Sequence, residues 1–510
     1  MKQRDVLILL LFAAILTAST ASAQVTDFSI STSGPHHVVQ GRYFTFYAVG
    51  KVLAGTDEGF PVPTVSNLPP GATVQFPNME RYCCQTSLYQ LTSDNSVRIV
   101  TSSSTPVGTY TVQVKYTTKG GVTRSVPYTV YVDPVPVPPT PLTVTSTPPL
   151  AAYDQWKANA VTYGLKHCTS TETSQYGFFG VDYYDGARVY YQIADLTGDT
   201  SWNACADMVY SWYSGYVNAN NGNLPGYYVF PHGLAMRYLR FNDTAARQTL
   251  ASMRANGSYT DWPNPSYIID WSVSREISYG IETNLVDQSV GGVPNPHLQE
   301  LVEALFGDFD QWFLSKSSSI VQPFMVALAG EAMIAYWDQT HDPRVLPMLQ
   351  LAADQMWAQS WSVPCQCFLY YNDPADPTNT SPAADLNGLV APIYGWVFKQ
   401  TGLTIYRDRG DQIFNGTLAS WLDGGKQFSQ TYRWSGNYVA WRNGPGTTTI
   451  SCDLNSDSSV NVIDVQLATN QVLGVSTCGS ADLNGDGQCT IVDVQRIINT
   501  SLGAACHLGP

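Results

Sequence analysis

The chain has 510 residues, too many for a single ordinary hydrophobic core, and this length fits about three folded units. Charged residues are only 13% of the chain and hydrophobic residues 44%, with 31 tyrosines and 13 tryptophans, a composition typical of ordered globular proteins. The formal net charge of -14 argues against nucleic acid or an anionic membrane surface as the main partner, because binding phosphates needs clustered lysine and arginine. Calcium and neutral glycans remain compatible.

Residues 1–23 have the layout of a secretory signal peptide. Lys2 and Arg4 precede the apolar run Val6–Ile15, and small residues at Ala21–Ala23 offer a cleavage site. A membrane anchor is the weaker alternative, because the apolar run is shorter than the ~20 residues of a spanning helix. The pattern predicts a secreted, extracellular protein that is free or attached to a cell surface or scaffold, with no membrane span in the mature chain.

Residues 24–133 are predicted to form an all-β domain. Alternating apolar and polar residues at Tyr43–Tyr47 and Thr109–Val114 indicate strands, and Pro69–Gly71 indicates a turn. Short strands at this spacing favour an antiparallel sandwich. The stretch 68–112 resembles the immunoglobulin-like modules of bacterial extracellular proteins, which implies a spacer or a binding platform; we favour the spacer.

Residues 134–149 are rich in proline, beginning with Pro134, Pro136, Pro138 and Pro139. Proline fixes an extended backbone, so we expect a semi-rigid linker between two units that fold independently.

Residues 150–446 change to a helical period, with apolar residues at steps of three and four, as in Tyr153, Trp156 and Ala160. A similar turn follows four aromatic or alanine-rich helical stretches: Thr197–Asp199, Asn242–Thr244, Thr340–Asp342 and Thr401–Leu403. The intervals predict helical hairpins that close their core as a ring or an arc. The pattern resembles the (α/α) toroids of glycoside hydrolases and polysaccharide lyases, without a motif that assigns a family.

A stretch rich in aromatic residues and carboxylates enters one predicted helix at 176–186. Asp182 and Asp185 share a face if the helix has begun by then, beside Tyr183 and Tyr184. A glycosidase needs two carboxyl groups with different tasks beside a platform for sugar rings, and this stretch offers both. The alternative is that Asp182 caps the helix and the tyrosines belong to the core.

A second candidate surrounds Glu276, which lies between Arg275 and Tyr279 on a predicted helix. Glu276 suits an acid or base, whereas Tyr279 and Arg275 equally suit a lyase, in which a tyrosine deprotonates carbon and an arginine neutralises a uronate. A plain Arg–Glu surface pair is the alternative. We predict Asp185 and Glu276 as the catalytic pair. The predicted substrate-binding residues lie in aromatic and polar segments: Tyr183, Tyr184, Tyr228, His232, Arg275, Tyr279, Tyr432 and Trp434.

The C-terminal segment 451–510 contains two copies of a twelve-residue loop, 453–464 and 482–493, each followed by an amphipathic helix. Calcium needs several hard oxygen ligands from a tightly curved loop, and these copies place such residues at the required spacing. Position six is Gly487 in the second loop and Ser458 in the first, so we expect weaker binding by the first. The predicted ligands of two calcium ions are Asp453, Asn455, Asp457, Ser459, Asp464, Asp482, Asn484, Asp486, Gln488 and Asp493.

Two such loops, each with one helix and Asp at position twelve, resemble type I dockerin modules. The resemblance implies calcium-dependent folding and docking to a cohesin-type module on an extracellular scaffold. Loop positions ten and eleven help choose the partner in such modules, and here they are apolar in both copies, Val462–Ile463 and Ile491–Val492. Four nearby cysteines depart from the usual pattern, so a divergent partner or an intramolecular calcium clamp is the alternative.

The ten cysteines fall in local groups, which favours disulfides in an oxidising compartment. The groups are Cys83/Cys84, Cys168/Cys205, Cys365/Cys367 and Cys452/Cys478/Cys489/Cys506. The last four allow three connectivities.

The leading hypothesis is therefore a secreted carbohydrate-active enzyme, a glycoside hydrolase that degrades a polysaccharide and is docked through a calcium-dependent tail. A polysaccharide lyase on the same toroid is one alternative. A non-catalytic glycan-binding or structural surface protein is the other.

Overall fold

The computed structural model describes residues 25–55, 63–78, 95–118, 120–142, 144, 147–169, 180–260, 271–318, 320–373, 381–442, 452–455, 459–476, 478–483, 488–502 and 506. The predicted signal peptide and the Cys83/Cys84 pair lie outside these residues. The chain divides into two compact units, Met1–Pro134 and Val135–Pro510. No helix within the described ranges is both long enough and apolar enough to cross a membrane.

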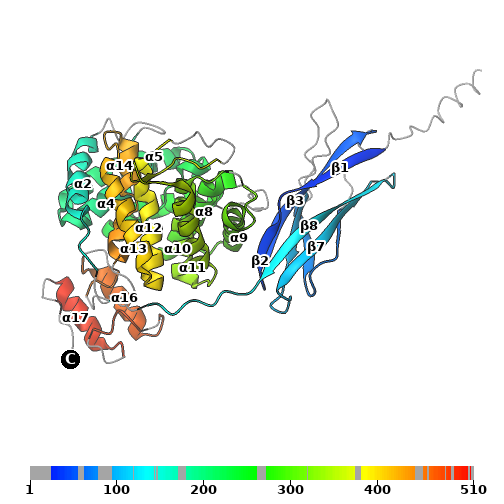
Figure 1. The fold of residues 1–510 in the computed structure, drawn as a ribbon. Helices are drawn as coiled ribbons and strands as arrows, with labels where there is room; N and C mark the ends of the chain where they lie inside the picture. The colour runs from blue at the N-terminus through cyan, green and yellow to red at the C-terminus, as the bar shows by residue number, and fades with distance from the viewer. Residues whose placement is uncertain are drawn as a thin grey trace, which may run out of the picture. The chain divides into compact units, whose positions relative to one another are not determined.

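The first unit is an immunoglobulin-like sandwich of two four-stranded sheets, ordered β1-β3-β6-β5 and β2-β8-β7-β4 (Figure 1). β2 pairs with β8 in parallel, and the other pairs are antiparallel. Alternate residues point inward, so Phe46, Val97 and Val114 are fully buried between the sheets. The strands are β1 (Asp27–Thr32), β2 (His36–Val39), β3 (Tyr43–Ala54), β4 (Thr64–Ser66), β5 (Thr73–Asn78), β6 (Asn95–Val100), β7 (Gly108–Thr117) and β8 (Thr123–Asp133).

The second unit begins with the proline-rich segment, whose described residues form neither helix nor strand. Its far end meets the helical body, because the Leu142 amide donates a hydrogen bond of 2.9 Å to the Thr401 carbonyl.

Among the described helices of this body, six form a closed inner ring. Each contacts the next in chain order, α4 to α6, α8, α10, α12 and α14, and α14 contacts α4 again. The inner helices are α4 (Gly186–Thr197), α6 (His232–Phe241), α8 (Ser274–Ser289), α10 (Pro323–Thr340), α12 (Asn387–Thr401) and α14 (Gly425–Tyr432). The outer helices are α2 (Tyr153–His167), α5 (Asn203–Ala219), α7 (Thr244–Asn256), α9 (Leu298–Phe309), α11 (Val345–Ser360), α13 (Thr404–Gly416) and α15 (Ser435–Trp441). Inner and outer helices alternate along the chain, which confirms the predicted (α/α) toroid (Figure 1).

The inner helices are buried on nearly every side because they contact neighbours in the ring and outer helices. α12 shows this most clearly, since its residues from Asn387 to Phe398 are all buried. Its first turn also needs a glycine: a Cβ at Gly388 would lie 2.5 Å from the Thr431 carbonyl oxygen at the end of α14. The small residue therefore allows α12 and α14 to approach closely.

The connections from inner to outer helices are mostly short turns. The four predicted turns end α4, α6, α10 and α12, and each contains a left-handed residue: Gly198, Asn242, His341 and Gly402. Such residues let the backbone reverse direction at once. The N-termini of the inner helices therefore gather at the opposite end of the ring.

That opposite end carries the longer connections, 168–185, 220–231, 257–273, 315–322, 361–386 and 417–424. We call it the loop end. Short elements lie in these connections or beside them: η2 (Gly226–Tyr228), η4 (Trp271–Val273), the π-helix η5 (Asp310–Leu314), β9 (Trp361–Ser362), β10 (Cys367–Phe368), η6 (Ala384–Leu386) and η7 (Thr417–Ala419). η1 (Thr200–Trp202) lies instead in the short turn between α4 and α5. Disulfides Cys168–Cys205 and Cys365–Cys367, both predicted, fix two of the connections.

The C-terminal tail packs α16 (Val462–Val472) against α17 (Ile491–Ser501) around a small core that includes Ala468 and Ile497. Of the three possible connectivities, the structure has Cys452–Cys506 and Cys478–Cys489. The first bridge joins the start of the module to its end.

Candidate functional site

The predicted site residues around Asp185 and Glu276 gather at the loop end of the ring. Tyr183 and Tyr184 precede α4, and Arg275 and Glu276 lie in the first turn of α8. Tyr227, which is not among the predicted residues, lies in η2 before α6, with its ring centroid 5.8 Å from the Arg275 guanidinium carbon. Ring closure thus brings together two stretches that are about 90 residues apart in sequence.

Glu276 is the carboxylate at the centre of this group. Arg275 donates to its Oε1 from Nε at 3.1 Å and from Nη2 at 2.5 Å. Its Oε2 is buried and has no hydrogen-bond partner among the described residues. η2 packs directly on the side chain, because a Cβ at Gly226 would lie 2.7 Å from the Glu276 Cγ. One oxygen is therefore held, and the other is enclosed without a hydrogen-bond partner, which is unusual for a buried carboxylate.

Tyr183 and Tyr184 approach α4 through an unusual backbone. Tyr184 and Asp185 have φ angles of 69° and 67°, a left-handed conformation that is rare for side chains of this size. The two rings meet edge to face with their centroids 4.9 Å apart. Burial raises the pKa of Tyr184 to about 12, although Arg275 and Arg433 oppose the shift. Both rings are buried, Tyr183 at 0% and Tyr184 at 3% exposure, so they belong to the core as in the alternative given above, and the charge of Glu276 acts on Tyr183.

Two further charged residues of the loop end were not predicted from the sequence. The Lys426 ammonium, in the first turn of α14, lies 5.6 Å from the centroid of the Tyr183 ring. Burial lowers the pKa of Lys426, and Asp385 opposes that shift. Asp385 lies half-buried in η6, where its Oδ2 accepts a hydrogen bond of 3.3 Å from the Gln430 amide. Neither residue stands in a recognisable motif, and only closure of the ring reveals them.

Asp185 occupies the N-cap of α4. Its Oδ1 accepts hydrogen bonds from the backbone amides of Arg188 and Gly233, and its Oδ2 accepts a second one, at 3.0 Å, from Gly233. The helix begins only at Gly186, so Asp182 and Asp185 do not share a helical face, contrary to that expectation. Asp182, the cap in the alternative given above, does not cap this helix; the cap is Asp185.

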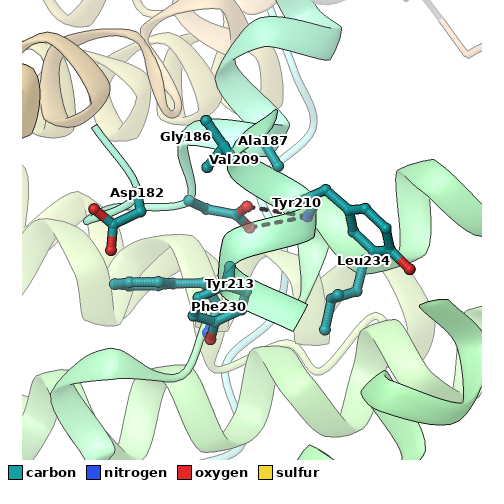
Figure 2. Close-up of a pocket in the computed structure, with 10 residues that line it drawn as sticks. Asp182, Gly186, Ala187, Val209, Tyr210, Tyr213, Phe230 and Leu234 are labelled. Carbon is teal, nitrogen blue, oxygen red and sulfur yellow. Dashed lines mark hydrogen bonds between the residues drawn. The ribbon is translucent and has the colours of Figure 1, made fainter. Parts of the chain in front are cut away.

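Asp182 lines a small cavity between α4, α5 and α6, together with Tyr210, Tyr213 and Leu234 (Figure 2). The cavity measures about 10 Å³, the scale of a single water molecule. Asp182 is 1% exposed, and Tyr228 donates a short hydrogen bond to its Oδ2. Burial raises the pKa of Asp182 to about 7, although the bond from Tyr228 opposes the shift.

A buried ionic network lies deeper in the ring. Glu331 of α10 accepts hydrogen bonds from Arg188 of α4 at 2.7 Å and from Arg433, just after α14, at 3.0 Å. Arg433 also donates to Glu282 of α8 at 2.6 Å, and the His232 ring lies 3.3 Å from the same oxygen. Four inner helices are thus joined through charges, and a fifth contributes His232.

His232, Glu282 and Glu331 bring ligand atoms within 4.8 Å of one another, as a metal site requires. The donor set does not fit a cation, because Arg188 and Arg433 already neutralise the two carboxylates. Burial lowers the pKa of His232 to about 3, with Arg188 contributing. We therefore interpret the cluster as the neutral floor of the site.

The other predicted substrate-binding residues also lie in the core. Tyr279 is fully buried under the Arg433 guanidinium, which lies 4.9 Å from its ring centroid. Tyr228 engages Asp182. Tyr432 donates to the Trp156 carbonyl at 2.9 Å, and Trp434 packs edge-on against Trp441. At these positions the side chains stabilise the packing of the ring's helices.

The tail repeats one arrangement in both loops. Asp464 Oδ1 accepts from the Leu454 and Asn455 amides, and Asp493 Oδ1 accepts from the Leu483 amide. Burial alone would raise the pKa of Asp493, but hydrogen bonds from Thr490 and Leu483 outweigh it and lower that pKa. Each position-twelve carboxylate is thereby turned back into its loop.

The oxygen donors of the loops suit a hard cation such as calcium. Asp453, Asn455, Ser459 and Asp464 are the described candidates in the first loop, and Asp482, Gln488 and Asp493 in the second. Asp457, Asn484 and Asp486 lie outside the described residues.

One protein-family model matches part of the chain, and solved structures resemble the chain only weakly. No curated protein matches the sequence. A crystal structure of a family 76 glycoside hydrolase from a bovine Bacteroides thetaiotaomicron strain has 10% identity and a TM-score of 0.26, covering 77% of each chain. A mutant of Salmonella alpha-2-macroglobulin has 9% identity and a TM-score of 0.26, covering 80% of this chain and 27% of that one.

TM-scores of 0.26 are too low to establish a shared fold. The assignment of the toroid therefore depends on the ring of helix contacts described above. The tail differs, because residues 451–500 match the family described as the dockerin type I domain. Domains of that family bind calcium, which agrees with the repeated oxygen donors. We conclude that the C-terminal part of this chain is a type I dockerin domain.

Proposed function

We propose that the chain is a secreted glycoside hydrolase that cleaves a polysaccharide at the loop end of its toroid. The observation that carries the proposal is the Glu276 carboxylate, held by Arg275 on one oxygen and unpartnered on the other, beside Tyr183 and Tyr227. A glycosidase needs a charged carboxylate and a second carboxyl group across the sugar. The ion pair suits Glu276 to the first role.

We assign the second role to Asp385 rather than to Asp185. Both oxygens of Asp185 accept backbone amides, which leaves the carboxyl occupied as a helix cap. Asp385 is half-buried at the loop end, and its charge acts on both Tyr184 and Lys426. Glu276 acts on Tyr183 and Asp385 acts on Tyr184, so both carboxyl groups lie near the buried tyrosine pair.

A lyase is the less favoured chemistry at the same site. A tyrosine that takes a proton from carbon works best when its own pKa lies near the working pH. Burial moves the pKa of Tyr184 up to about 12 and raises that of Tyr279 well above its ordinary value. Both shifts oppose such a role, whereas carboxylate chemistry needs neither tyrosine to ionise.

We further propose that the dockerin domain binds two calcium ions, one in each loop, and docks the enzyme to a cohesin-like module on an extracellular scaffold. The duplicated Asp464 and Asp493 arrangement supports two sites. The exposed side chains at positions ten and eleven, such as Val462 and Ile491, support a docking surface at the start of each helix.

Purified full-length protein should release reducing ends from at least one of xylan, mannan, mixed-linkage β-glucan and carboxymethyl cellulose. Glu276→Gln and Asp385→Asn should each lower the rate by about 100-fold or more, the low end for losing acid–base catalysis. Glu300→Gln is the matched control, because Glu300 is the third residue of outer helix α9 as Glu276 is of α8.

No reducing ends from any of these polymers would reject the hydrolase. Release of a product with a new carbon–carbon double bond from polygalacturonate would instead identify a lyase. Near-normal turnover by either variant would remove that residue from the pair.

A further inference from the structure

Trp421 lies in the connection that leads into α14 at the loop end, and its side chain is 63% exposed. Every other tryptophan within the described ranges is buried or half-buried. Exposing an indole to water is unfavourable, so a folded chain that keeps one on its surface needs a reason for it.

The segment around Trp421 is fixed on both sides. The Ser420 hydroxyl donates a hydrogen bond of 3.1 Å to the Ala384 carbonyl, and the buried His167 ring donates one of 2.8 Å to the Leu422 carbonyl. Asp423 forms an ion pair with Lys166. The indole is therefore presented by a braced loop rather than by a loose end. The hydrogen bond of Ser420 also brings this loop beside η6, which contains Asp385.

Tyr370 is a second exposed ring at the loop end, in the connection that leads into α12. It is 43% exposed, and it lies near enough to Tyr184 in the candidate site to contribute to the raised pKa of that phenol. Its amide donates to the Ser381 carbonyl at 2.9 Å, and Asn372 pairs with Val321 in both directions. Its ring packs against Phe324, with centroids 5.3 Å apart. This support leaves part of the ring open to solvent.

We propose that Trp421 and Tyr370 are binding platforms for sugar rings that flank the reacting bond, so that the site takes a neutral glycan chain several residues long. Flat aromatic rings bind the apolar faces of pyranoses through contact area, without charge. α12 and α14 are neighbours in the ring, so the platforms border the carboxylates on the side where Asp385 lies. The inference rests on the proposed function for the position of the bond.

The test is affinity electrophoresis of the full chain through gels that contain soluble xylan, mannan or mixed-linkage β-glucan. The wild-type protein should be retarded in at least one gel, and Trp421→Ala with Tyr370→Ala should weaken that binding by about tenfold or more. Phe241→Ala is the matched control, because Phe241 is 46% exposed but ends α6 at the opposite end of the ring. Its retardation should equal that of the wild type.

Equal retardation of the double variant and the wild type, or no retardation of the wild type in any gel, would overturn the platforms. Product release from the same polymers is measured in parallel to separate the two proposals. Binding that depends on Trp421 and Tyr370 without products would reject the hydrolase and keep the platforms. Release of products together with unchanged binding by the variants would reject the platforms and keep the hydrolase.

Discussion

Arg433 donates a hydrogen bond of 2.6 Å to Glu282, and these residues belong to helices on opposite sides of the ring. Arg433 follows α14 and Glu282 lies in the middle of α8, with two inner helices between them in either direction. Arg433 is 1% exposed and Glu282 is fully buried. The pair therefore spans the centre of the toroid out of contact with water.

Replacing Arg433 with methionine should destabilise the helical body by about 3–5 kcal/mol, because Glu282 would lose its arginine partner while buried and Glu331 would keep only Arg188. Thermal or urea unfolding followed by tryptophan fluorescence measures the change. Adding Glu282→Gln should recover part of the loss, since it removes one of the stranded charges. If Arg433→Met alone were as stable as the wild type, the ionic network would not stabilise the helical ring.

Asp182 should make stability depend on pH. Burial raises its folded pKa to about 7, whereas an unfolded aspartate ionises near pH 4. Between these values the folded chain retains a proton that the unfolded chain has lost, so stability falls as pH rises from about 4 to about 7 and is then level. A shift of this size corresponds to a loss on the order of 4 kcal/mol.

Asp182→Asn should remove that slope, because the amide does not ionise and still accepts from Tyr228. The variant should be more stable than the wild type near pH 8 and similar to it near pH 4. Calorimetry of both proteins across this range is the measurement. Parallel pH profiles would contradict a neutral Asp182 in the folded state.

Asp185 provides a test between a helix cap and a catalytic group. Asp185→Ala should cost about 2–3 kcal/mol of stability, since the buried amides of Arg188 and Gly233 lose their acceptor. Asp185→Asn keeps one acceptor oxygen and should lose less. If Asp185→Asn abolished turnover with unchanged stability, the carboxyl would belong to the chemistry and our assignment of Asp385 would fall.

The dockerin domain should bind two calcium ions in the full chain, and each loop should be separable. Asp464→Ala and Asp493→Ala each remove one position-twelve carboxylate, so calorimetric titration should report one ion in either variant and none at comparable affinity in the double variant. The second loop should bind more tightly, because it has Gly487 where the first has Ser458. A wild-type stoichiometry of one would reject the second site.

The sequence predicts the helical body well because its turns are local. Asn242 and Gly402 end inner helices in the left-handed conformation, and short-range chemistry alone selects such residues there. The dockerin loops are equally local, since all oxygen donors of one ion come from twelve successive residues. In both cases the deciding contacts lie within a few residues of each other.

The candidate site was less predictable because its members meet only when the ring closes. Asp385 and Lys426 carry no motif, and each reaches Tyr184 or Tyr183 across helices that are distant in sequence. The sequence around Asp185 does not show that its carboxyl is engaged, since the Gly233 amide that binds it lies 48 residues away. An aromatic residue beside polar ones, such as Tyr432, has the same local sequence whether it faces solvent or Trp156.

The Cys452–Cys506 bridge changes how the tail responds to mechanical tension. The chain enters the dockerin domain at residue 452, so when a partner holds the domain, any pull from the enzyme arrives there. The bridge passes that pull at once to residue 506, and the two ends of the module share it. Peeling must then proceed from the first loop and from α17 together, rather than unzipping one calcium loop after the other. An attachment built in this way withstands tension better than an open chain end does.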